Sequence, residues 1–215
     1  MFLVSKAQGK SMMEGIMERY SFAEEDPQLR QRPLSEQNLK TKFVIPMLQA
    51  LNWDVYNFNQ VREQKNFFGL LPDFILIDDH GKIILVEVKP PYAYNELEND
   101  LRKYSDNPNV RKEAAILLLT TFKDSRICTL GKKKGIRTKE ISCSHYISRF
   151  DKLWKNLSNS EEGFKTRTYE KALAPRSKIR AKDARAYMTR HLLKSVSNVV
   201  LELGHDHRHN ASDSL

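Results

Sequence analysis

Three charged residues stand at the borders of two neighbouring apolar stretches of the sequence. Asp73, preceded by a proline, opens the first stretch, whereas Glu87 and Lys89 close the second. Residues two apart in a strand point to the same face of a sheet, so Glu87 and Lys89 are expected on one side. If the two stretches pair as strands through a turn at 79–82, Asp73 lies near Glu87. The pattern predicts two carboxylates and an ammonium group at the edge of a core.

Charges grouped in this way indicate metal chemistry. An unpaired buried charge costs on the order of several kcal/mol or shifts its pKa, and a divalent cation between two carboxylates would offset their repulsion. Ligation by oxygen alone favours Mg²⁺ or Mn²⁺ over zinc. Such an ion can polarise a phosphodiester and lower the pKa of a water, while a nearby lysine orients the water or stabilises the developing negative charge. These residue types are therefore suited to phosphodiester hydrolysis.

Each part of the pattern also has a purely structural interpretation. Glu-x-Lys in a strand is usually an ion pair on one face, and Pro-Asp is common in turns, so neither alone identifies a site. The order of the parts is more specific. A helix with an early acid precedes a strand that starts with Asp, then come an apolar strand that ends in Glu-x-Lys, a helix and a further buried strand.

Hydrophobic periodicity predicts the elements that must position these residues. A helix is expected over 35–53, with Ser35 as its N-cap and with a kink or an early end at Pro46. A helix is expected between the apolar strands at 83–88 and 114–121, which makes them a crossover unit and predicts that these two strands are parallel. The expected strands are 54–64, 73–78, 83–88, 114–121 and 127–130, and the other expected helices are 12–20, 94–104, 146–157 and 177–203.

Composition restricts the class of protein. The chain has 215 residues, a net charge of +9, a mean hydropathy of −0.59 and two cysteines. No apolar run approaches the ~20 residues that span a bilayer, and two cysteines support no disulfide framework. We therefore expect an intracellular globular protein with no membrane partner, and the positive charge favours a polyanion as its partner.

The sequence divides into a central domain with an extension at each end. Residues 1–34 are polar and form an N-terminal extension, and residues 35–160 hold the predicted α/β core. Residues 161–204 are expected to form a basic helical extension, and residues 205–215 a disordered tail.

The ordered motif resembles the PD-(D/E)xK, or restriction-endonuclease-like, nuclease superfamily. Its context is most similar to the N-terminal nuclease domain of type I restriction R subunits. The similarity extends over about 35–121 and is carried by Ser35-Glu36, Phe43-Val44-Ile45-Pro46-Met47-Leu48, Leu51-Asn52-Trp53-Asp54, Pro72-Asp73 and Glu87-Val88-Lys89. This resemblance implies an α/β fold with a central mixed sheet flanked by helices, in the order α-β-β-β-α-β, here with a C-terminal helical extension.

The resemblance also implies roles for five residues. Asp73 and Glu87 would bind the metal, the carbonyl of Val88 would complete the inner shell, and Lys89 would be the catalytic lysine. Glu36 would be the helix acid that supports the metal site, although an acid in a first helical turn is also favoured by the helix dipole. The implied cofactor is Mg²⁺, with Mn²⁺ able to substitute, and no small-molecule cofactor is expected.

One departure from the family pattern falls on the helix after the Glu-x-Lys strand. Relatives of the type I domains have Gln-x-x-x-Tyr there, whereas this chain has Asp100 in the Gln position and Tyr104 in the Tyr position. Tyr104 is a candidate DNA contact, but it also belongs to the apolar stripe of its helix, which favours a core position. The chain leaves no room for a helicase motor, so we expect a small stand-alone nuclease, similar to Holliday-junction resolvases or to nucleases of viruses and mobile elements.

DNA is the expected partner because the positive charge is concentrated. Residues 123–139 include seven basic residues and one acid, with Lys132, Lys133, Lys134 and Arg137 among them. Each phosphate that such residues neutralise steepens the salt dependence of binding. The alternative is a solvated lysine loop. Without a recognition-helix or zinc-finger signature, the backbone or the shape of DNA is the expected target, as at a junction, flap or duplex.

Quaternary structure and two rival functions complete the expectations. Cleavage of both strands needs two active sites, which a homodimer would supply, and the apolar stripe of the tail helix could pair two copies. The first rival is a non-catalytic DNA-binding module that keeps the nuclease fold. The second is an assembly protein that oligomerises through the tail helix.

Overall fold

The computed structural model describes residues 4–27, 34–130 and 136–172, with side chains through 168. The chain divides into two compact units, Met1–Ala174 and Pro175–Leu215, and the described residues all belong to the first. The predicted helix at 177–203, the tail at 205–215 and the three lysines Lys132, Lys133 and Lys134 lie outside the described residues.

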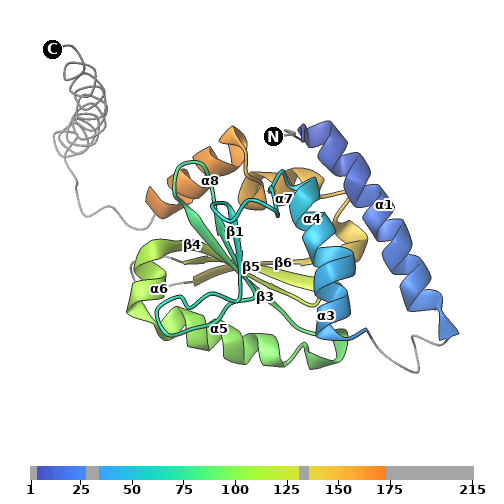
Figure 1. Ribbon diagram of the computed structural model, residues 1–215, viewed down its shortest axis with the longest axis horizontal. Coiled ribbons are helices and arrows are strands. Elements are labelled where there is room, and N and C mark those ends of the chain that lie inside the picture. Colours follow the sequence, from blue (N-terminus) through green and yellow to red (C-terminus); the bar gives the residue numbers. More distant parts are fainter. Residues whose placement is uncertain (1–3, 28–33, 131–135, 173–215) are drawn as a thin grey trace, which may run out of the picture. The chain divides into compact units, whose positions relative to one another are not determined.

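A six-stranded mixed sheet forms the centre of the first unit, with its strands in chain order from β1 to β6 (Figure 1). Neighbouring strands are antiparallel except for β3 and β4, which are parallel. The strands are β1 (Val61–Glu63), β2 (Phe74–Ile77), β3 (Ile83–Val88), β4 (Ala114–Thr120), β5 (Asp124–Leu130) and β6 (Ile136–Ser142). The predicted crossover from β3 to a parallel β4 is thereby confirmed.

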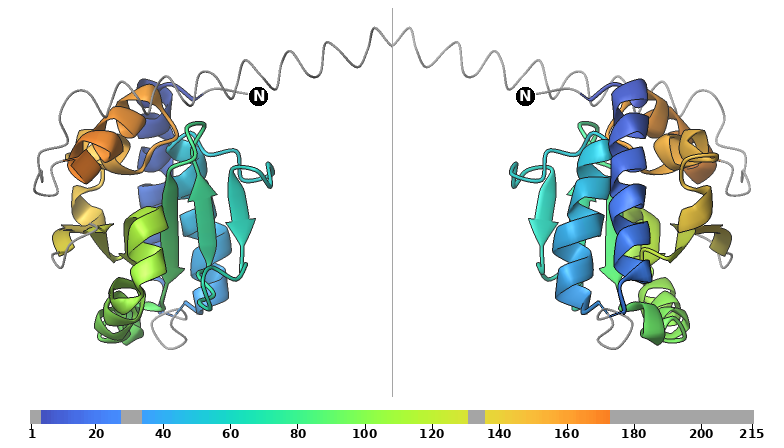
Figure 2. Two further views of the ribbon diagram at one scale, coloured as in Figure 1. Left: turned by 90° about the vertical axis from the view of Figure 1, so that its left-hand side faces the viewer. Right: turned by 90° about the vertical axis from the view of Figure 1, so that its right-hand side faces the viewer.

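Helices cover both faces of the sheet (Figures 1 and 2). The described helices are α1 (Lys6–Glu25), α3 (Glu36–Leu39), α4 (Ile45–Ala50), α5 (Glu96–Asp106), α6 (Pro108–Glu113), α7 (Phe150–Leu157) and α8 (Glu161–Ala172). Alternate residues of β3 divide between two cores, because side chains alternate across a strand. Val86 packs in one core with residues of α1, α4 and α7, whereas Leu85 packs in the other with residues of α5 and α6. The expected α/β architecture, a mixed sheet flanked by helices, is confirmed.

The first helix after the N-terminal region contains a π-helical turn. Ser35 is the N-cap, as predicted, and its hydroxyl accepts a hydrogen bond from the backbone N–H of Asn38. The helix then widens into the π turn η1 (Lys40–Val44) before α4. Pro46 stands near the start of α4 and has no N–H to continue the α-helical ladder, so the predicted break takes the form of a π turn.

Two other predicted elements need correction, and one strand was not predicted. The strand expected over 54–64 is reduced to β1, because residues 54–60 form turns in which Asp54 and Asn57 side chains accept backbone hydrogen bonds. Strand β6 was not predicted, since its sequence is mostly polar and its side chains are largely exposed. The helix expected at 12–20 is longer and runs over the whole of α1.

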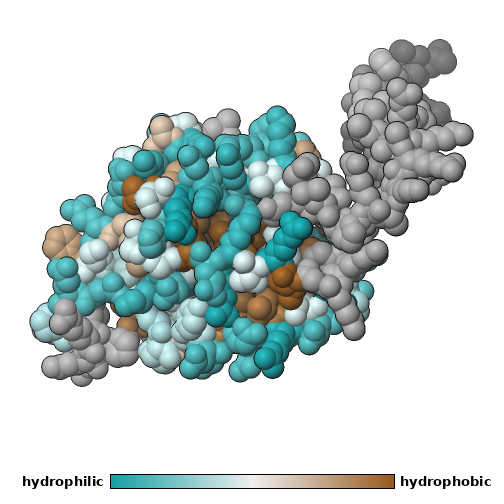
Figure 3. All heavy atoms as spheres, turned by 180° about the vertical axis from the view of Figure 1, so that it is seen from behind, coloured by the Kyte–Doolittle hydropathy of each residue, from teal (hydrophilic) through white to brown (hydrophobic). Residues whose placement is uncertain are grey.

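The surface of the described residues is mostly hydrophilic. Seen from behind, hydrophobic residues show through only in small patches (Figure 3). Among the described helices, none combines the length and the apolar character needed to cross a membrane.

Candidate functional site

Asp73 and Glu87 meet across the β2–β3 pair at the carboxyl end of β3. Phe74 pairs with Val86, so the register brings the residue before β2 beside the end of β3. Asp73 Oδ2 accepts a hydrogen bond from the backbone N–H of Val88 at 2.6 Å, and both carboxylates are buried. The predicted pairing of the two strands is confirmed.

Lys89 lies on the same face as Glu87, as the spacing predicted. Its Nζ is 2.9 Å from Glu87 Oε1. Val88 points the other way, into the core formed with α1, α4 and α7. The same-face ion pair exists, and it belongs to a larger group of charges at this end of the sheet.

Tyr104 completes the contacts of Glu87. Its hydroxyl donates to Glu87 Oε2 at 2.8 Å, and the residue is fully buried. A buried ring offers no surface to DNA, so the expected DNA contact at Tyr104 is wrong and the core position is correct. Tyr104 lies on the apolar face of α5, and this position brings its hydroxyl to the carboxylate of Glu87. The sequence did not predict this contact.

Lys40 is the site residue that sequence reasoning missed. Its Nζ is 2.6 Å from Glu36 Oε1 and also forms an ion pair with Asp73 Oδ1, and Lys40 is only 7% exposed. The spacing of Glu36 and Lys40 by four residues could have indicated their pairing. No sequence signal links Lys40 to Asp73. This lysine connects Glu36, the predicted supporting acid, to the predicted metal ligand.

Asp100 is a second addition to the site. It lies on α5, and its Oδ2 is 3.5 Å from Lys89 Nζ. That buried oxygen has no hydrogen-bond partner among the described residues. A buried acceptor without a partner is costly, which is typical of a site that binds a further group.

Together these residues form what we call the carboxylate cluster: Glu36, Lys40, Asp73, Glu87, Lys89, Asp100 and Tyr104. Four carboxylates face two ammonium groups, which leaves an excess of two negative charges. The cluster draws on α3, the π turn, the start of β2, the end of β3 and α5.

The electrostatics of the cluster reflect this excess. Burial raises the pKa of Glu87, and the negative charge of Asp73 adds to the effect. Burial also raises the pKa of Asp73, and the hydrogen bond from Lys40 only partly opposes it. Burial disfavours the ammonium of Lys89, but its hydrogen bond to Glu87 and the negative charges of Glu87, Asp100 and Glu36 together outweigh this and raise the pKa of Lys89. Burial likewise disfavours the ammonium of Lys40, but its contacts with Asp73 and Glu36 together raise its pKa. Both lysines therefore stay charged, whereas the two buried carboxylates would gain from a further cation.

A divalent cation fits the donor set. The groups that could bind a metal at Asp73 and Glu87 are carboxylate and carbonyl oxygens, since both lysines there are protonated, and oxygen ligands suit Mg²⁺ or Mn²⁺. The excess of two negative charges matches the charge of one such ion, and the buried Oδ2 of Asp100 has no hydrogen-bond partner among the described residues. Within the described part of the chain, no group of three or more His, Cys, Asp and Glu side chains is arranged to hold a metal ion. A site here would therefore rest on two carboxylates completed by backbone or water oxygens.

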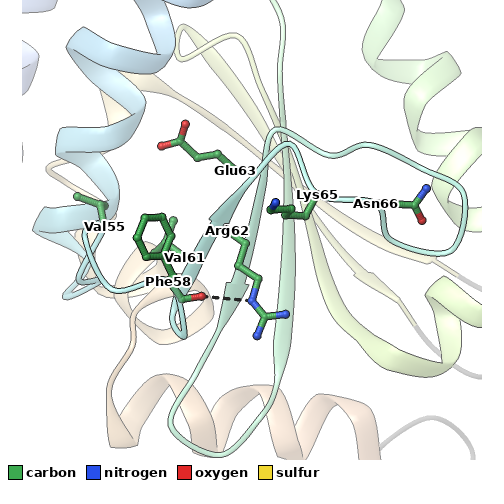
Figure 4. Close-up of a pocket in the computed structure, with 7 residues that line it drawn as sticks. All are labelled: Val55, Phe58, Val61, Arg62, Glu63, Lys65 and Asn66. Carbon is green, nitrogen blue, oxygen red and sulfur yellow. Dashed lines mark hydrogen bonds between the residues drawn. The ribbon is translucent and has the colours of Figure 1, made fainter.

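An open pocket of about 860 Å³ lies along β1, close to the cluster in the sheet (Figure 4). The backbone N–H of Gln64 donates to the carbonyl of Asp73, so the chain that lines the pocket runs directly beside the cluster. The pocket is lined by Val55, Phe58, Val61, Arg62, Glu63, Lys65 and Asn66. Phe58 and the nearby Tyr56 are each 83% exposed. Of the predicted DNA contacts, Arg137 is exposed on β6, the last strand of the sheet.

Comparison of the chain with protein-family models, with curated proteins and with solved structures yields no match.

Proposed function

We propose that the protein is a metal-dependent DNA endonuclease of the PD-(D/E)xK type, with the restriction-endonuclease-like version of the α/β fold. The observation that supports this most is the excess of negative charge around the buried carboxylates of Asp73 and Glu87, with Lys89 held beside them. A structural ion pair needs one acid for each base. In the carboxylate cluster the acids outnumber the bases, and they lie at the end of the sheet where the motif of Asp73, Glu87 and Lys89 predicts a metal site.

The residues of the cluster have separate tasks in this proposal. Asp73 and Glu87 hold the ion, with the carbonyl of Val88, and Glu36 supports them through Lys40 or through water. When bound, Mg²⁺ would supply Lewis-acid polarisation of the phosphodiester and a more acidic water. Lys89 keeps its proton and stabilises the negative charge that develops on the phosphate. Tyr104 fixes the carboxylate of Glu87 by its hydrogen bond.

The pocket along β1 is suited to a DNA strand. Phe58 and Tyr56 offer aromatic faces on which bases can stack, and Arg62 and Lys65 can neutralise phosphates. The Nε of Arg62 donates to the carbonyl of Phe58 at 3.2 Å, which ties the aromatic loop to β1. The proposal also includes contacts of Arg137 and of the lysines at 132–134 with the DNA backbone. It further includes a homodimer, whose two active sites would cut both strands.

A cleavage panel tests the proposed activity. Duplex, flap and four-way-junction DNA are incubated with the full chain in Mg²⁺, in Mn²⁺ and in EDTA, next to Glu87→Gln and Lys89→Ala. We expect cleavage that needs metal and is lost in both variants. Exposed residues provide matched controls, Glu96→Gln for the acid and Lys42→Ala for the lysine. Cleavage that survives Glu87→Gln and Lys89→Ala would contradict the mechanism.

The alternative function is a DNA-binding or assembly protein without catalysis. It predicts binding that weakens with salt, or self-association, and no cleavage in any metal. The presence of Glu36, Asp73, Glu87 and Lys89 in one cluster favours the nuclease.

A further inference from the structure

Lys40 is held where a cation of the cluster belongs. Its ammonium contacts Glu36 on one side and Asp73 on the other, and its side chain is 9% exposed. Among its described neighbours, Lys40 thus connects the supporting acid of the proposed site to one of the two proposed metal ligands. A buried lysine between two carboxylates supplies one positive charge at the place where the nuclease proposal requires two.

The geometry points to Lys40 as a built-in counter-ion of the metal site. In the structure its ammonium contacts one oxygen of Asp73, and a divalent ion that binds this oxygen would have to displace it. This inference rests on the proposed function, because it assumes that Asp73 and Glu87 hold the ion. It assigns to Lys40 a positioning role that the family motif does not include.

The contacts of Asp73 indicate why displacement is needed. Asp73 Oδ2 already accepts a hydrogen bond from the backbone N–H of Val88. Asp73 Oδ1 is the other oxygen, and it is the one that pairs with Lys40. An incoming ion therefore competes with Lys40 for the side of the carboxylate that does not face the β3 backbone. Two cations at one carboxylate oxygen would also repel each other strongly in a buried setting.

The local backbone gives the ammonium of Lys40 a second partner besides Asp73. Lys40 is the C-cap of α3 and the first residue of the π turn. Its carbonyl accepts a hydrogen bond from the backbone N–H of Ile45. Glu36 lies one helical turn earlier on the same face, so the Glu36–Lys40 pair does not depend on Asp73. When the ammonium leaves Asp73 it keeps Glu36 as its partner, and no isolated charge is left in the site.

Metal affinity in the absence of DNA tests the inference. Mg²⁺ and Mn²⁺ are titrated calorimetrically into the full chain, into Lys40→Met and into Lys40→Gln. Because removal of a competing positive charge favours the ion, both variants should bind it about tenfold or more tightly than the parent. Lys42→Met is the matched control, because Lys42 is exposed on the same turn, and its affinity should equal that of the parent.

Thermal unfolding provides a readout that does not involve activity. In EDTA, Lys40→Met should unfold at a lower temperature than the parent, since Glu36 and Asp73 lose their shared cation. Added Mn²⁺ should raise the unfolding temperature of Lys40→Met more than that of the parent. Lys40→Gln retains a hydrogen-bond donor for Asp73. If Lys40→Met does not fold, the same unfolding measurements are made on Lys40→Gln.

The outcomes separate the inference from the proposed function. If the parent and both Lys40 variants bind metal equally well, or the variants bind it more weakly, the counter-ion role is wrong while the metal site stands. If neither the parent nor any Lys40 variant binds metal, the metal site and the counter-ion role are both wrong. Tighter binding by the variants supports the role of Lys40 even if no DNA is cleaved.

Discussion

Strand β2 has a buried aspartate next to each end, and the two aspartates are in opposite electrostatic settings. Asp73 precedes the strand and belongs to the carboxylate cluster, whereas Asp78 follows it and pairs with Arg167 of α8. Five residues of extended chain separate them by about 17 Å. Each aspartate is bound to a basic side chain, so burial and pairing alone do not distinguish a functional site from a structural one.

The pair at Asp78 is balanced and its hydrogen bonds are satisfied. Arg167 Nη2 is 2.6 Å from Asp78 Oδ2, and both side chains are almost fully buried. The same guanidinium donates to the carbonyls of Ser158 and Asn156. Asp78 Oδ1 accepts the backbone N–H groups of His80 and Lys82, which fixes the β2–β3 turn. One acid meets one base, and the pair connects α8 to the sheet.

The cluster at Asp73 differs because acids outnumber bases. Burial raises the pKa of Asp73 and of Glu87, and a buried oxygen of Asp100 has no hydrogen-bond partner among the described residues. A protein that needed only stability would gain by replacing such a group with apolar side chains. The difference between the two ends of β2 teaches that an imbalance of buried charge, rather than buried charge itself, indicates a binding site.

Substitution of Glu87 by Gln should give the largest effect on activity. It removes one of the proposed metal ligands, and we expect a loss of cleavage of at least about 10²–10³-fold. Metal-free stability should be unchanged or raised, because one of two opposed buried charges is gone. Cleavage rate and urea unfolding are measured on the same preparation. A large loss of stability in Glu87→Gln would mean that the cluster is structural, like the pair at Asp78.

Substitution of Arg167 by Met should give the largest effect on stability. It leaves Asp78 buried without its partner, which costs about 3–5 kcal/mol of unfolding free energy. Urea unfolding monitors the change, and Lys165→Met is the control because Lys165 and its partner Glu161 are exposed. Metal affinity should not change in Arg167→Met at a temperature where it is folded. A change in metal affinity there would show that the two ends of β2 are coupled.

Substitution of Phe58 by Ala should weaken DNA binding by a smaller amount. Stacking of one base on an aromatic side chain contributes about 1–3 kcal/mol, so the affinity for single-stranded DNA should fall by about tenfold. Binding is measured in EDTA, which separates it from cleavage. Phe22→Ala is the control, because Phe22 is 67% exposed on α1 and lies outside the pocket. An equal effect of both changes would remove the pocket along β1 from the proposed DNA path.

The smallest expected effect is the contribution of Glu87 to the dependence of stability on pH. Burial raises the folded pKa of Glu87 above its ordinary value of 4.5, so the folded protein holds this proton more tightly than the unfolded chain. Stability from this group is present below about pH 4.5 and is lost as the pH rises through the folded pKa. In EDTA, Glu87→Gln should not lose this stability as the pH rises. The difference in unfolding free energy between Glu87→Gln and the parent should therefore increase with pH in this window, in favour of the variant. A constant difference would contradict the burial effect.

Sequence alone was enough to predict much of the cluster and the elements that carry it. Glu87 and Lys89 share a face because of the two-residue repeat of a strand, and the turn before β3 brings Asp73 beside them. The parallel pairing of β3 and β4 followed from the helix between them. Local rules of this kind depend on neighbours in the chain, which the sequence contains.

Only the tertiary structure decided which other charges join the cluster. Lys40 reaches Asp73 because α3 and the π turn come to the start of β2, and Asp100 reaches Lys89 because α5 packs back over the sheet. The apolar stripe of its helix favoured a core position for Tyr104, but only the structure placed its hydroxyl on Glu87. Residues 54–60 formed turns where a strand was expected, since side-chain hydrogen bonds competed with sheet pairing. The residue types and their local spacing determined the chemistry that is available, and packing between distant segments determined the balance of charge.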